Sequence, residues 1–212
     1  MHHSLIKDHQ IGCYRSRYQE IEKDFLEFKK KMENFKEKKV FKFSSNNLYK
    51  HDDIRITSNI AEMKSDIPRL SGTILIKPKL TSIINSIRIR IKAIDCFIGL
   101  GIGNATILSR NKFVLNDYQL ENMQHGCYLV SDNGFKFSHD SAEENLKPWN
   151  GFQIDDVIQI NFNRENLNVN FKVENKGNVA NLGVKQKFLD NFIYFVVVLG
   201  GIHDCVEIMN DN

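Results

Sequence analysis

The chain has 212 residues, 42% hydrophobic and 26% charged, with a formal net charge of +3. This composition is typical of a soluble globular protein, and the length suits one domain plus an appendage. The charge is too small, and the lysines too evenly mixed with acidic residues, for a nucleic-acid-binding surface. The longest apolar run, residues 192–199, is too short to span a bilayer, and the N-terminus lacks a signal-peptide layout. We therefore expect a cytoplasmic protein that binds neither nucleic acid nor membrane.

The N-terminal region has the pattern of a helix. Over residues 14–39, apolar side chains recur at alternating spacings of four and three, as at the a and d positions of a coiled coil. These positions hold Tyr14, Tyr18, Ile21, Phe25, Phe28, Met32 and Phe35. Aromatic residues are unusual at these positions of a two-stranded coiled coil, which prefers aliphatic ones. Two interpretations are therefore open: a single amphipathic helix that packs on the neighbouring domain, or a coiled coil that dimerises the protein. We predict a disordered segment at 1–13, this helix at 14–42 and a folded domain at 43–212.

In the folded domain the apolar period changes to two, which indicates β-strands. Strands are predicted at 54–57, 72–77, 87–91 and 97–102, with a polar loop at 58–70. Arg88, Arg90 and Lys92 alternate with isoleucines, so one face of that strand is basic. Such a face is usually solvated, and less often it meets an acidic groove of a partner. Residues 103–124 show no clear period and are predicted to form a long functional loop.

The C-terminal half reads as a series of hairpins. Asn133-Gly134 is a strong two-residue turn signal, because a type I′ turn needs positive φ at both central positions. Strands at 158–162 and 167–173 are joined by a turn at 164–166, and 192–199 and 205–209 are joined by Gly200-Gly201. Regular strands without a β-α-β alternation predict a mainly β fold, a two-sheet antiparallel β-sandwich preceded by the helix.

An ordered set of short motifs resembles the SPRY domain. It comprises F-I-G-L-G at 97–101, G-C-Y at 126–128, D-N-G at 132–134, D-V-I-Q-I-N-F at 156–162, L-G at 199–200 and V-E-I at 206–208. Their order and spacing match the family over residues 54–209. Two turns depart from its pattern: Asp155-Asp156 replaces Gly-Asp, and Asn175-Lys176-Gly177 replaces Asn-Gly.

The resemblance implies a concanavalin-like sandwich that binds a short peptide or loop of another protein and catalyses nothing. By position, the binding surface would comprise the loop 58–70, the loop 103–124 and the turn at 199–201. Leu199 stands where some members carry a pocket aromatic, and Tyr118 could supply the other aromatic. Arginines in the two loops would suit acidic or carbonyl-bearing peptides. The candidate binding residues are Arg69, Arg110, Tyr118, Leu199, Gly200 and Gly201.

Other classes of function remain open. A coiled coil before such a domain resembles the tripartite-motif ubiquitin ligases, but the RING and B-box are absent from this sequence. The chain could instead be a structural subunit that uses its helix and broad surface contacts, or a carbohydrate-binding or hydrolytic sandwich. No pair of carboxylates suited to glycoside hydrolysis is evident. His125-x-Cys127 and His203-x-Cys205 could bind zinc only if their strands were neighbours. We expect a non-enzymatic adaptor without a metal or cofactor, whose helix forms a homodimer or attaches the chain to a larger assembly.

Overall fold

The computed structural model describes residue 23 and residues 40–64, 70–116, 124–141, 149–189 and 192–210. The predicted disordered segment and almost all of the predicted helix lie outside these ranges, including its side chains Tyr18, Ile21, Phe25, Phe28, Met32 and Phe35. The helix and the homodimer through it therefore stay predictions. Where the described chain resumes, Lys42–Phe43 forms strand β1 and does not continue a helix.

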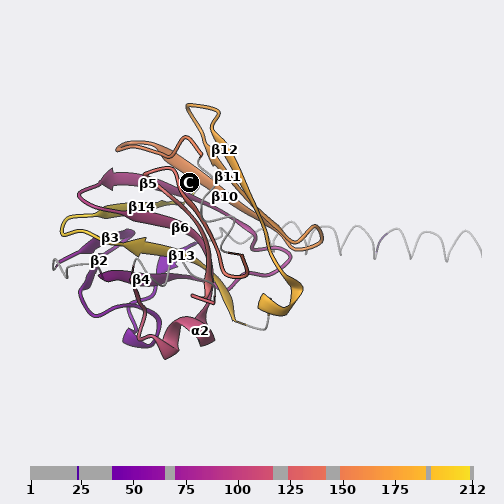
Figure 1. Ribbon diagram of the computed structural model, residues 1–212, viewed down its shortest axis with the longest axis horizontal. Coiled ribbons are helices and arrows are strands. Elements are labelled where there is room, and N and C mark those ends of the chain that lie inside the picture. Colours follow the sequence, from indigo (N-terminus) through magenta and orange to yellow (C-terminus); the bar gives the residue numbers. More distant parts are fainter. Residues whose placement is uncertain are drawn as a thin grey trace, which may run out of the picture. The chain divides into compact units, whose positions relative to one another are not determined.

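The described residues form two antiparallel sheets that face each other (Figure 1). The first sheet has the strand order β1-β4-β13-β6-β8-β9, with β7 also paired to β4. Its strands after β1 are β4 (Leu70–Lys77), β6 (Ile98–Asn104), β7 (Val114–Asn116), β8 (Cys127–Ser131), β9 (Lys136–Ser138) and β13 (Ile193–Leu199). The second sheet has the order β12-β11-β10-β5-β14-β3-β2. Its strands are β2 (Ile54–Thr57), β3 (Ile60–Met63), β5 (Ser86–Ala93), β10 (Val157–Asn163), β11 (Asn168–Val173), β12 (Val179–Gly183) and β14 (Cys205–Met209).

The main hydrophobic core lies between the sheets and follows the alternation of the strands. Ile87, Ile89 and Ile91 point inward from β5, while β13 contributes Phe195 and Val197. The other face of the first sheet is also covered, because the short helix α2 (Ala105–Arg110) and Phe113 pack there in a second apolar cluster. A strand buried on both faces reads as a continuous apolar run, which explains the sequence of β13. The prediction of a mainly β, two-sheet antiparallel sandwich is confirmed.

The basic row on β5 lies on the outer face of the second sheet. Arg88 donates from its Nε and from one terminal nitrogen to the two carboxylate oxygens of Glu174, at 2.6 and 2.8 Å. This hydrogen bonding lowers the pKa of the glutamate. Arg90 lies 3.5 Å from Glu207 on the adjacent strand β14. Two of the three cations are therefore paired within the sheet, which favours the solvated face over the acidic groove of a partner.

The two segments predicted as loops contain regular structure. Strand β3 lies within 58–70, and it is reached by a tight turn in which Ser58 has a φ of 58°. Within 103–124, the side chain of Asn104 accepts hydrogen bonds from the N–H groups of Thr106 and Ile107 and so caps α2. Two 3-10 turns, η1 (Asn47–Tyr49) and η3 (Gln186–Phe188), and strand β12 were also not predicted. Within the described ranges, no helix is long and apolar enough to cross a membrane.

Candidate functional site

One end of the first sheet brings together parts of the three segments predicted to bind a partner. Leu199, at the end of β13, is in register with Gly72 near the start of β4 and with Ile98 at the start of β6. Strand β7 pairs with the same end of β4, where Gly72 faces Val114. We call this end the loop edge and define it by residues 70–72, 94–97, 114–116, 131–135 and 199–204.

A buried carboxylate holds two connections of the loop edge together. Asp204 is completely buried, and its oxygens accept five backbone N–H groups. Three come from the β5–β6 connection, at Asp95 (2.6 Å), Cys96 (3.2 Å) and Phe97 (3.1 Å). Two come from the β13–β14 turn, at Gly200 (3.0 Å) and Gly201 (2.7 Å). Because one side chain satisfies donors of both connections, their relative position is fixed by the fold.

The turn between β8 and β9 is held against a neighbouring segment. Trp149 donates its indole N–H to the carbonyl of Ser131 at 3.0 Å and its backbone N–H to Gly134 at 2.8 Å. Gly134 has a φ of 89°, and a Cβ there would lie 2.6 Å from the carbonyl oxygen of Trp149. Asn133 does not have a positive φ, so the turn is not the predicted type I′; the N–H of Gly134 donates to the Ser131 carbonyl at 3.2 Å instead. The Asp132 carboxylate accepts the N–H of Ile98 at 2.8 Å, and burial raises its pKa. The turn is therefore preformed.

Three phenylalanines line the outer face of the first sheet at this end. Phe97 and Phe137 have ring centroids 6.0 Å apart, and Phe135 and Phe137 are 6.3 Å apart. Phe137 is buried and Phe97 half-buried, whereas 42% of Phe135 is exposed. The Phe97 carbonyl also accepts the N–H of Gly200 at 2.8 Å, so this aromatic row continues into the 199–201 turn. Exposed aromatic side chains on a rigid frame are common anchors in protein interfaces.

The candidate residues from the sequence occupy different environments. Gly200 and Gly201 lie at the loop edge, where an added Cβ would come within 2.9 Å of the Phe97 Cβ and 2.6 Å of the Cys96 Cβ, so both positions require glycine. Leu199 is completely buried in the main core, so its side chain is not part of an accessible surface. Arg110 is exposed at the C-terminal end of α2. Arg69 and Tyr118 lie outside the described residues.

Sequence reasoning missed the aromatic row and Asp204 as parts of this site. The signal for Phe135 was available, because it directly follows the Asn133-Gly134 turn and a large apolar side chain there is unusual. The row as a whole was hidden, since it combines residues from different strands.

The fold does not bring the two His-x-Cys pairs together into a zinc site. Cys127 lies on β8 of the first sheet and Cys205 on β14 of the second, so the two His-x-Cys pairs are not on neighbouring strands. Within the part of the chain that the structure describes, no group of three or more His, Cys, Asp and Glu side chains is placed to hold a metal ion.

Comparison with solved structures identifies the fold. The SPRY domain of human HERC1 is 12% identical with a TM-score of 0.56, over 79% of this chain and 97% of that chain. The TRIM65 PSpry domain is 8% identical with a TM-score of 0.55, over 81% and 92% of the two chains. The NEUZ (NHR) domain of Neuralized from Drosophila melanogaster is 11% identical with a TM-score of 0.50, over 80% and 91%.

At these identities the likeness concerns the fold alone. No family model matches the chain, and no curated protein is significantly similar to it in sequence. The described domain is therefore a SPRY-like β-sandwich, as the motifs of the sequence predicted.

Proposed function

We propose that this chain is a non-catalytic protein-interaction module that docks a short peptide or loop of a partner protein on the loop edge. The observation that carries the proposal is the aromatic row of Phe97, Phe135 and Phe137 beside the Gly200-Gly201 turn, on strands and turns that are fixed by backbone hydrogen bonds. A preformed surface lowers the entropy cost of binding, so a few apolar anchors can supply useful affinity.

The geometry of the aromatic row suggests how a partner would make contact. Phe135 would be the exposed anchor, and Phe137 and Phe97 would connect it to the turn at Gly200. Arg110, Arg69 and Tyr118 are proposed to flank this contact and to select acidic or carbonyl-bearing segments, as the resemblance implies. The proposed role is that of an adaptor in the cytoplasm.

The proposal is tested by affinity capture from the native cell with mass-spectrometric identification. The wild type is compared with a loop-edge variant, Phe97→Ser/Phe135→Ser, with a helix variant, Phe25→Lys/Phe28→Lys, and with the control Lys172→Gln, whose side chain is exposed on the second sheet. A defined partner that is lost only from the loop-edge variant is the expected result. Partners lost only from the helix variant would instead make the chain a structural subunit of a larger assembly.

A further inference from the structure

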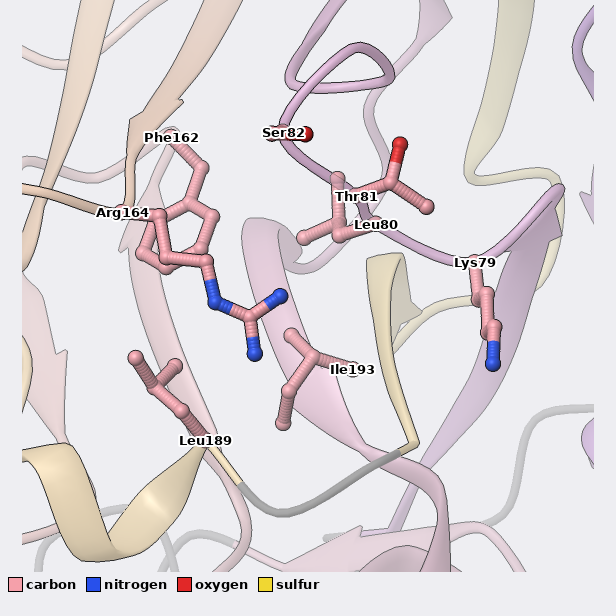
Figure 2. A pocket seen from close by; sticks show the side chains of 8 residues that line it. All are labelled: Lys79, Leu80, Thr81, Ser82, Phe162, Arg164, Leu189 and Ile193. Atoms are coloured by element: carbon pink, nitrogen blue, oxygen red, sulfur yellow. The ribbon is translucent and has the colours of Figure 1, made fainter.

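A second candidate binding site lies at the opposite end of the sandwich from the loop edge. It is a pocket of about 280 Å³ lined by Lys79, Leu80, Thr81, Ser82, Phe162, Arg164, Leu189 and Ile193 (Figure 2). Strand β13 begins at the pocket with Ile193 and ends at the loop edge with Leu199. At about 3.3 Å per residue, the two sites are about 20 Å apart. They are therefore separate surfaces.

The floor of the pocket is apolar and buried. Leu80, Phe162, Leu189 and Ile193 are each between 3% and 6% exposed, although they come from four different segments of the chain. Their apolar side chains would be covered further by an occupant of the pocket, which releases water from the remaining exposed area. The floor thus favours a ligand that presents an apolar group.

Hydrogen bonds hold the walls of the pocket in place. The N–H of Leu80 donates to the Ile193 carbonyl at 2.8 Å, and the N–H of Phe162 donates to the Asn85 carbonyl at 2.7 Å. The Thr81 hydroxyl accepts the N–H groups of Ile83 and Ile84 at 3.2 and 2.9 Å, which closes the β4–β5 connection into a compact turn. The pocket is consequently preformed, as ligand sites usually are.

The charged residues of the lining are both cations. Arg164 and Lys79 are exposed, and neither forms an ion pair with any residue that the structure describes. Figure 2 shows the Arg164 guanidinium reaching over the pocket toward Ile193, with Lys79 on the other side. In contrast, Arg88 and Arg90 on β5 are matched with glutamates. A carboxylate beside an apolar group would complement this combination of charge and floor.

We propose that this cation-flanked pocket binds a short peptide segment in which an apolar side chain lies next to a carboxylate. The apolar side chain occupies the floor over Phe162 and Leu189, and the carboxylate pairs with Arg164. The volume is at the low end for ligand sites, so it accommodates one or two side chains and not a large cofactor. Binding here is independent of the loop edge.

The test uses the full chain and a random heptapeptide library displayed on phage. Peptides are selected on the wild type after counter-selection on Arg164→Glu, and synthetic copies are measured by fluorescence anisotropy. The titrations include Arg164→Gln, Lys79→Gln and the control Lys172→Gln, with thermal unfolding to show that each variant is folded. Phe135→Ala tests whether a selected peptide binds at the loop edge instead.

We expect the selected peptides to carry Asp or Glu within two residues of Leu, Ile, Met or Phe. Arg164→Gln should weaken their binding at least fivefold, Lys79→Gln at least twofold, and Lys172→Gln or Phe135→Ala less than twofold. Replacing the acidic residue of a peptide by its amide should match the loss seen with Arg164→Gln. The proposal is overturned if no peptide survives the counter-selection, if the survivors lack an acidic residue, or if Arg164→Gln leaves their affinity unchanged.

Discussion

Removing the Asp204 carboxylate should destabilise the domain strongly. Asp204→Ala removes an acceptor from five backbone N–H groups of the β5–β6 connection and the β13–β14 turn, among which the N–H of Gly200 keeps the Phe97 carbonyl as an acceptor. A hydrogen bond to a charged group contributes about 1.5–3 kcal/mol, but bonds to one carboxylate are not additive and water would reach some of the donors. We therefore expect a loss of about 3–5 kcal/mol, which is at the upper end for single substitutions.

The isosteric variant separates hydrogen bonding from side-chain volume. In Asp204→Asn, one oxygen remains, but the amide NH₂ group faces the donors that the other oxygen had accepted, so we expect a loss of about 2–4 kcal/mol. Both variants are compared with the wild type by urea unfolding, with Asp52→Asn as an exposed carboxylate control that changes stability by less than about 0.5 kcal/mol. If Asp204→Ala and Asp204→Asn both stay within about 1 kcal/mol of the wild type, Asp204 does not hold the loop edge.

Three further predictions concern the interior of the sandwich. Burial lowers the pKa of His125 from its ordinary value of 6.5 to about 4, so the folded state binds fewer protons than the unfolded state below pH 6.5. This residue should therefore lower the free energy of unfolding by about 3 kcal/mol between pH 6.5 and 4. In urea unfolding, a His125→Asn variant that loses as much stability over this pH range as the wild type would contradict the prediction. A Cβ at Gly101 would lie 1.9 Å from a backbone oxygen of β8, whereas one at Gly183 meets nothing within 4 Å. Gly101→Ala should thus lower the free energy of unfolding by about 2–4 kcal/mol, and Gly183→Ala by less than about 1 kcal/mol. Equal effects of the two substitutions in thermal unfolding would refute the close packing of β6 against β8. Iodoacetamide should alkylate the exposed Cys96 in the folded protein but reach Cys127 only on unfolding, because burial hides the Cys127 thiol and raises its pKa. Equal labelling rates of the two cysteines, measured by mass spectrometry, would be inconsistent with the fold.

Much of the sandwich could be predicted because its signals are local. Alternation of apolar and polar residues located five strands of the second sheet but not β3 or β12, and the predicted bounds of 54–57 and 205–209 coincide with those of β2 and β14. The continuous apolar run of β13 indicated a strand covered on both faces, and α2 and Phe113 cover its outer face. The order of the SPRY-like motifs then indicated the fold that the solved structures share.

The remaining features were not predicted because they are short or depend on distant contacts. Helix α2 has six residues, too few to display a helical period, and its cap uses Asn104, which also ends a strand. Asp204 receives N–H groups from as far as 109 residues earlier in the chain, so no window of sequence relates it to its partners. The aromatic row likewise forms only when β6, β8 and β9 are aligned in the sheet.

The most direct test of the proposed function is photo-crosslinking from position 135 in the native cell. p-Benzoylphenylalanine replaces Phe135 in one version of the chain and Lys172, on the exposed face of the second sheet, in another. We expect a discrete crosslinked protein from position 135 that is absent from position 172 and is lost when Phe97→Ser is added. Identical crosslinks from both positions, or crosslinks from position 172 alone, would contradict partner docking at the loop edge.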